Sequence, residues 1–280
     1  SGYLEVVSKN KEGIETKGNL TFSGGTGDYV ISSQDDCLNT TTDSKEANNA
    51  RNTLTIDVNS LYAIVSNEAD EGDAIDSNGE LIINGGTILA LAKPGSDAGI
   101  DSETGIYING GTVLATGDMY DEIKSDSKQT VLVLSFGNRP EEQSEIKLLD
   151  SNLEEIFSHK TDRTYSTLIY SSPNLTEGDY TLYNGETLLG YSSQGNSMGN
   201  GPMGGEMTPP EGNMNESGNE PPEKPDGNMP EGGNEPPEKP DGNMPNNDNG
   251  PMNSNQTASN KTFTITSGIN LFSGIANYSE

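Results

Sequence analysis

Acidic residues that recur at a regular interval are the side chains of this chain best suited to chemistry. Carboxylate oxygens are preferred ligands of hard cations such as Ca²⁺, which takes six to eight oxygens. The sequence therefore predicts calcium at one or more of these positions, and the alternative is that the acids are solvated surface charges that hold no ion. The candidate ligands are Asp35, Asp36, Asp70, Glu71, Asp73, Asp76, Asp97, Asp101 and Asp121.

A sequence repeat must position these acids. The repeats at Gly13, Ala74 and Gly99 begin with a small residue, an aliphatic anchor and an acidic residue, and continue through a glycine-containing turn into an alternating strand; degenerate copies begin at Cys37 and Glu122. The interval is near 25 residues and shows no helical periodicity, which is typical of a β-solenoid. The anchors, spaced 24, 37, 25 and 23 residues apart, are Ile14, Leu38, Ile75, Ile100 and Ile123.

We therefore expect an all-β fold with a right-handed parallel β-helix over residues 1–137, forming the C-terminal coils of a longer array. Stacked strands lie roughly 4.8 Å apart, so acids of neighbouring repeats should come close together. Alternation predicts that the outer residues of the triplets 20–22, 54–56, 81–83 and 106–108 face the core. Asn84 and Asn109 should stack at a corner, and the glycine pairs at 24–25, 85–86 and 110–111 should close the bends.

The repeat pattern ends near residue 137. Residues 138–195 and 257–280 predict a small antiparallel β-module, with a hairpin at Asp150–Asn152 and another at Asn184–Gly185. A helix is the competing interpretation for residues 145–157. Residues 196–256 are rich in Pro, Gly and Met and contain no Val, Ile, Leu or aromatic residue, so they predict a disordered acidic insertion.

The charge balance excludes some partners. The chain has 44 acidic and 15 basic residues, for a formal charge of −29. Nucleic acid is excluded as a partner because its phosphates require Lys and Arg, and anionic polymers would be repelled unless cations intervene. No apolar run approaches the length of a membrane span. Cys37 is interpreted as a buried small filler and His159 as a structural or surface residue.

Three tyrosines are candidates for binding a sugar ring, namely Tyr107, Tyr62 and Tyr29. Tyr107 and Ile82 occupy outward positions on adjacent repeats, which equally suits docking of the C-terminal module. Lys124 follows the last anchor and abuts two acids. It is the catalytic candidate if the protein is a lyase, because calcium-assisted β-elimination needs a base beside the metal. A plain ion pair is the alternative role for Lys124.

The repeats LIINGGTILA and IYINGGTVLA, with DAIDSNG and GIDSETG before them, resemble a clostridial-type family of secreted carbohydrate-binding domains. The similarity extends to TVLVLSF, LIYSSPNL, GDYTLYNG and the terminal TFTITSG and NLFSG. The resemblance implies a calcium-containing parallel β-helix with a pectate-lyase-like shape that binds cellulose and polygalacturonate. The second repeat lacks the Gly-Gly pair, and Ala98 stands where other repeats have Asp, so the number of calcium ions is not implied.

Three functions follow as expectations. The first is non-catalytic, calcium-dependent binding of a polysaccharide such as pectin, polygalacturonate or a cellulose-like glycan, outside the cell or at its surface. The second is a structural or adhesive role at the cell surface or in a matrix without glycan binding, with association to a cell wall or to other copies. The third is a calcium-dependent polysaccharide lyase.

Overall fold

The computed structural model describes residues 2–41, 52–95, 97–160, 162–195 and 258–279. Every element in these residues is a β-strand, as the alternating sequence patterns predict. The strands form a mixed sheet of sixteen strands and a separate sheet of three. The predicted insertion at 196–256 and residues 42–51 lie outside the described residues.

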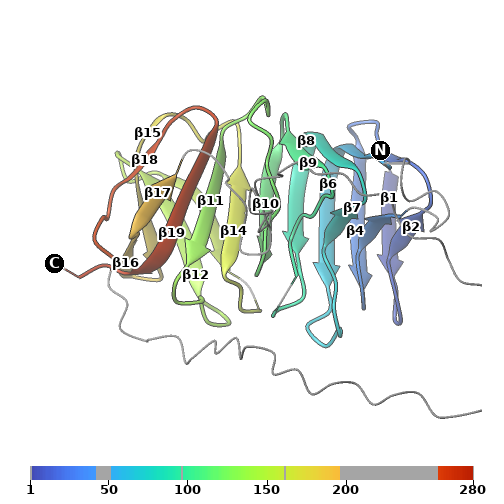
Figure 1. The fold of residues 1–280 in the computed structure, drawn as a ribbon, viewed down its shortest axis with the longest axis horizontal. Coiled ribbons are helices and arrows are strands. Elements are labelled where there is room, and N and C mark those ends of the chain that lie inside the picture. Colours follow the sequence, from blue (N-terminus) through green and yellow to red (C-terminus); the bar gives the residue numbers. More distant parts are fainter. Residues whose placement is uncertain (1, 42–51, 96, 161, 196–257, 280) are drawn as a thin grey trace, which may run out of the picture. The chain divides into compact units, whose positions relative to one another are not determined.

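The first part of the large sheet is parallel and follows the sequence repeats (Figure 1). Corresponding residues of successive repeats pair directly, for example Leu54 with Leu81 and Leu81 with Ile106. Residues 20–22 and 105–108 form short strands at the side of this array. The strands are β1 (Gly2–Val7), β3 (Leu20–Phe22), β4 (Gly27–Ser33), β6 (Leu54–Val65), β8 (Glu80–Leu91), β9 (Gly105–Ile108) and β10 (Thr112–Gly117).

The anchors form the three-stranded parallel sheet, whose strands are β2 (Ile14–Thr16), β5 (Leu38–Thr40) and β7 (Ile75–Ser77). Ile14 pairs with Leu38, Leu38 with Ile75, and a single bridge continues the row to Ile100. The predicted alignment of these four anchors is confirmed. The residue after each anchor therefore stands beside its counterpart in the next repeat.

The predicted alignment of the fifth anchor is wrong. Ile123 pairs with Ile106, one strand position further along the repeat, and not with Ile100. Met119 takes the place beside Ala98. The backbone advances eight positions from Ala98 to Ile106 but only four from Met119 to Ile123, so Ile123 reaches the row of the second strand early.

The rest of the chain builds mainly antiparallel strands. β14 lies between β10 and β11 and is antiparallel to both, whereas β11 and β19 are parallel. The hairpin predicted at Asp150–Asn152 joins β12 to β13, so the helical interpretation of 145–157 is wrong. The strands are β11 (Val131–Phe136), β12 (Glu145–Asp150), β13 (Glu155–Lys160), β14 (Thr167–Ser171), β15 (Gly178–Asn184), β16 (Thr187–Gly190), β17 (Ser193–Gly195), β18 (Phe263–Ile265) and β19 (Ile269–Asn277).

The buried side chains form two hydrophobic cores. The first contains the predicted inward residues of the repeats, including Leu54, Ile56, Leu81 and Ile83, which are fully buried. The second is rich in aromatic residues and lies among the C-terminal strands. Alternate residues of β11 enter the first core and the second core, so a domain boundary at residue 137 stays a prediction.

Two finer predictions about the repeats are confirmed. The Asn109 amide donates a 3.0 Å hydrogen bond to the Asn84 side-chain oxygen, as expected for stacked corner residues. Gly86 and Gly111 have positive φ values of 110° and 89°, which side chains rarely adopt. A Cβ on Gly111 would also strike the backbone of Gly86, and one on Gly86 would strike the Val58 carbonyl, so these two glycines permit the close approach of successive repeats, whereas a Cβ on Gly25 would meet no described atom.

Candidate metal centre

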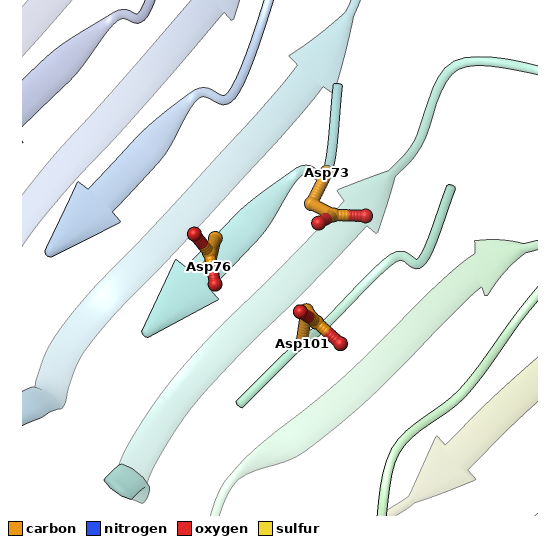
Figure 2. A group of neighbouring side chains, drawn as sticks. All are labelled: Asp73, Asp76 and Asp101. Atoms are coloured by element: carbon orange, nitrogen blue, oxygen red, sulfur yellow. The ribbon is translucent and has the colours of Figure 1, made fainter. Parts of the chain in front are cut away.

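Three carboxylates converge at the edge of the three-stranded sheet (Figure 2). Asp73 precedes β7, Asp76 lies within it, and Asp101 follows Ile100 in the next repeat. One oxygen from each of them lies within 4.8 Å of the others. All three side chains are partly buried. Such a group of oxygens can hold a cation between two repeats.

Backbone amides hold the acids in place from one repeat to the next. Asp36 accepts a 2.8 Å hydrogen bond from the Asp73 amide, and Asp73 accepts one of 2.5 Å from the Ala98 amide. Asp121 accepts a 3.2 Å bond from the Ser102 amide, directly after Asp101. Each of these bonds engages one carboxylate oxygen and fixes the direction of the side chain.

The carboxyl groups of this edge resist ionisation. Burial is the largest cause that raises the pKa of Asp36 to about 6, of Asp76 to about 7 and of Asp73 to about 8. Repulsion among the neighbouring acids adds to each of these shifts. The pKa of Asp101 is raised as well, first by burial and then by a hydrogen bond with Asp121. A positive charge placed at this edge would therefore favour the ionised form of these carboxyl groups.

Asn39 extends the same row, because it pairs with Asp76 across β5 and β7. Its amide nitrogen donates a 2.5 Å hydrogen bond to Asp36. Its amide oxygen is buried and accepts no hydrogen bond from the described residues. Asn39 was not among the predicted ligands, although its position after an anchor, like that of Asp76 and Asp101, is visible in the sequence.

The other predicted ligands do not join the group of three. Asp35 is buried and forms a 2.8 Å ion pair with Lys11. Asp70 and Glu71 are exposed. Asp97 is close enough to help raise the pKa of Asp73.

The sequence alignment places Asp121 in the row of Asp36 and Asp73, and this prediction is wrong. Met119 stands in that row beside Ala98. The side chain of Asp121 instead reaches Asp101 and the Ser102 amide. Asp121 therefore lies at the acidic edge, but at a different position from the one that the repeat predicts.

The strand register separates the three candidate tyrosines. Tyr29 pairs with Leu61, Tyr62 with Leu89, and Tyr107 with Ile82. The Tyr29 ring packs edge-on against Phe22 at 5.1 Å and lines a cavity of about 380 Å³ beside Gly2–Leu4. Tyr62 is 38% exposed, and Tyr107 is partly buried. They do not form one aromatic platform.

The remaining candidate residues have identifiable partners. The Lys124 ammonium lies 2.6 Å from Glu122, and this hydrogen bond is the largest cause of its raised pKa. Cys37 is fully buried beside Ser33, as expected of a small filler. His159 is buried on β13, in the second half of the chain.

No family model matches the chain, and no curated protein or solved structure matches it either. Within the described residues, the structure contains no helix that is long and apolar enough to cross a membrane.

Proposed function

We propose that this chain is a non-catalytic, calcium-dependent polysaccharide-binding protein that acts outside the cell or at its surface. The observation that carries the proposal is the convergence of Asp73, Asp76 and Asp101. We further propose that the repeats wind as a right-handed parallel β-helix. Parallel pairing of equivalent residues in both sheets supports this winding, because each repeat then contributes one rung to each row.

Electrostatics favour an ion at the acidic edge. Two unit charges 4.8 Å apart repel by about 3.5 kcal/mol at an effective dielectric constant of 20. A divalent cation reverses the sign of this interaction for all three acids at once. The donor set is composed of oxygen atoms, which selects a hard cation over zinc or copper.

The chemistry of the neighbouring groups favours calcium over magnesium. Ca²⁺ accepts six to eight oxygens in flexible geometry, whereas Mg²⁺ demands a near-ideal octahedron and retains its water. Asp36 accepts a hydrogen bond from the Asp73 backbone amide, Asn39 pairs with Asp76 across β5 and β7, and Asp121 is hydrogen-bonded to the Asp101 side chain. Their oxygens can complete a large coordination shell with small movements of the side chains.

Binding of an acidic polysaccharide would depend on the same ion. A chain of charge −29 repels polygalacturonate unless cations lie between the two polymers. Calcium at an accessible edge supplies the opposite charge, and the exposed Tyr62 offers an apolar face to a pyranose ring. A neutral, cellulose-like glycan would use the tyrosine without requiring the ion.

The first experiment is calorimetric titration of the metal-free protein with Ca²⁺ at pH 7.5. We expect saturable binding that Asp101→Asn weakens at least about tenfold, a loss of about 1.4 kcal/mol. Glu141→Gln removes the same charge from an exposed position and should retain the wild-type affinity. The absence of saturable binding in the wild type would exclude the calcium site.

The second experiment is a glycan array probed with the protein in Ca²⁺ and in EDTA. Binding of uronate-containing glycans that EDTA abolishes is the expected result. If Ca²⁺ binds but no glycan does under either condition, the structural or adhesive role at a surface or matrix replaces the proposal. Calcium-independent binding of neutral glycans would retain polysaccharide recognition but remove the role of the ion.

The lyase alternative depends on Lys124. A general base must be deprotonated near the working pH, whereas the ion pair with Glu122 raises the pKa of Lys124. An assay for unsaturated uronate product with polygalacturonate and Ca²⁺ distinguishes this alternative, since a lyase would form product that Lys124→Ala abolishes.

A further inference from the structure

Three neighbouring parallel strands present an aromatic face to solvent. The strands are β1, β4 and β6, which pair in that order (Figure 1). Tyr3 on β1 is 66% exposed, and Tyr62 on β6 is 38% exposed. Leu61 and Ala63, on either side of Tyr62, are fully buried in the first core. Because successive side chains of a strand alternate between its faces, Tyr62 points away from that core.

The strand register places both tyrosines on the same face. Tyr3 pairs with Asp28, Asp28 pairs with Ser60, and Ser60 lies two residues before Tyr62 on the same strand. Residues two apart on a strand share a face, and so do paired residues of neighbouring strands. The tyrosines are therefore two strands apart, or roughly 9.6 Å across the sheet. Val30, which pairs with Tyr62, lies on the strand between them.

A fixed carboxylate lies on the same middle strand. Asp28 Oδ1 accepts a 2.6 Å hydrogen bond from the Asn59 side-chain amide and a 2.7 Å bond from the Ser60 hydroxyl. The same two bonds, that of Asn59 first, lower the pKa of Asp28, so this carboxyl group is ionised at neutral pH. Both bonds reach Oδ1, and Oδ2 is used in neither of them. An ionised carboxylate oxygen accepts short, strong hydrogen bonds from hydroxyl groups.

The apolar part of this face continues a surface that the protein itself covers. Tyr62 pairs with Leu89, and Leu89 pairs with Leu114, which is buried in the second core. Leu89 is partly buried and packs against the same core. Within the described residues, the second core thus extends along this row as far as Leu89. Tyr62 is the next residue of the row, and it is exposed.

The charges of this face select the chemistry of a ligand. The face carries carboxylates but no Lys or Arg, so an anionic polymer would be repelled from it. The hydroxyl groups of a neutral ligand can instead donate hydrogen bonds to the carboxylates, while the aromatic rings pack against the apolar face of a sugar ring. The outward residues of the three strands are Tyr3, Glu5, Val7, Asp28, Val30, Ser32, Ser60, Tyr62 and Ile64.

We propose that this face binds a neutral β-1,4-linked glycan, whose chain crosses the strands with alternate sugar rings on Tyr3 and Tyr62 and the ring between them above Asp28. Such a glycan is extended, and every second ring presents the same face, which suits two tyrosines that are separated by one strand. The inference rests on the polysaccharide-binding function proposed above and names a ligand that requires no ion. The candidate metal centre lies at the edge of the three-stranded sheet, whereas this face belongs to the sheet of sixteen strands.

Calorimetric titration of the full chain with cellohexaose in EDTA tests the site. We expect saturable binding that Tyr3→Ala and Tyr62→Ala each weaken at least about fivefold, as truncation of an aromatic contact residue does. Tyr62→Phe keeps the ring and should retain the affinity. Tyr183→Ala makes the same truncation on β15, outside this face, and should also retain it. The absence of saturable binding, or an affinity that either Tyr3→Ala or Tyr62→Ala leaves unchanged, would overturn the proposal.

A parallel titration with polygalacturonate in Ca²⁺ separates this inference from the proposed function. If polygalacturonate binds with Ca²⁺ but cellohexaose does not bind, the neutral-glycan site is excluded and the calcium-dependent function is retained. If cellohexaose binds in EDTA but polygalacturonate does not bind with Ca²⁺, the neutral-glycan site is retained and the calcium-dependent function is excluded.

Hydroxyl-radical footprinting of the wild type is a second measurement, and it needs no variant. Cellohexaose in EDTA should lower the oxidation of Tyr3 and Tyr62 and leave that of Tyr183 unchanged. Equal oxidation of Tyr3 and Tyr62 with and without the glycan would overturn the proposal. If the footprint is unchanged and sedimentation instead shows a dimer that Tyr62→Ala abolishes, the face is a contact between copies of the chain and not a glycan site.

Discussion

Asp73 accepts a 2.5 Å hydrogen bond from the backbone amide of Ala98, and this bond ties the acidic edge of one repeat to the backbone of the next. The oxygen that accepts this bond is Oδ1, so Oδ2 of the same carboxyl group is not used in it. Asp36 makes the same kind of bond to the Asp73 amide. The acids are thus structural acceptors and candidate metal ligands together.

This double role predicts different effects at different acids. Asp73→Ala should weaken Ca²⁺ binding and also destabilise the metal-free protein, because it removes the acceptor of the Ala98 amide and leaves that amide without its partner. Asp76→Asn should weaken Ca²⁺ binding but stabilise the metal-free protein, because it removes repulsion at the edge. Urea unfolding in EDTA and calorimetry with Ca²⁺ measure the two effects. Equal changes in metal-free stability for both variants would contradict the assigned roles.

The metal-free protein should lose stability as the pH rises from 7 to 8.5. The folded pKa values of about 8 for Asp73 and about 7 for Asp76 exceed the usual unfolded value near 3.9. A group with a raised folded pKa stabilises the fold while it is protonated, and this contribution is lost as the pH rises through that value. The expected decline is on the order of 1 kcal/mol per pH unit.

Urea unfolding in EDTA measures this decline. His159 contributes little above pH 7, because its pKa is lowered to about 4 in the folded state and lies near 6.5 when unfolded. The double variant with Asn at 73 and 76 should show a flatter profile. Saturating Ca²⁺ should reverse the trend, since it binds the deprotonated acids, and a decline unaffected by Ca²⁺ would exclude these carboxyls as its cause.

Much of the pairing between repeats is predictable, because strand alternation and the repeat interval are both visible in the sequence. The four anchors Ile14, Leu38, Ile75 and Ile100 pair as expected, because each follows a small residue and precedes an acidic or amide residue at the same place in its repeat. The predicted alignment of Ile123 is wrong because Ile123 pairs with Ile106 of the second strand and not with Ile100. A match of residue types does not tell how many residues separate two strands. Which acids converge also depends on that register.

The contacts of Arg163 have no comparable signal in the sequence. Arg163 reaches Val65 and Ala92 across separations of 98 and 71 residues, and it lies outside the repeat. The amide oxygen of Asn39 could have been predicted from its row, since it stands beside Asp76 in the register. Periodicity thus predicts which acids share the edge of the three-stranded sheet, but it gives no account of contacts that are made only once in the fold.

Cys37 should be inert in the folded protein. Burial is the largest cause that raises the pKa of its thiol to about 11, and the side chain is fully buried. Because the thiolate is the reactive form, reaction with a disulfide reagent at pH 8 should be at least about a hundredfold slower than in urea. A rapid folded-state reaction would show that the segment between β4 and β5 opens readily.

The inward and outward positions of β8 offer a matched test of the repeat core. Ile83 is fully buried between Ile56 and Ile108, whereas the adjacent Ile82 is partly buried between Thr55 and Tyr107. Ile83→Ala should cost about 2–5 kcal/mol of unfolding free energy, because it leaves a cavity in the closely packed row. Ile82→Ala should cost about 1 kcal/mol, since water already reaches that side chain. Urea unfolding of the two variants compares the same chemical change at neighbouring positions, so equal losses would place both residues in a core and contradict the alternation on which the repeat depends.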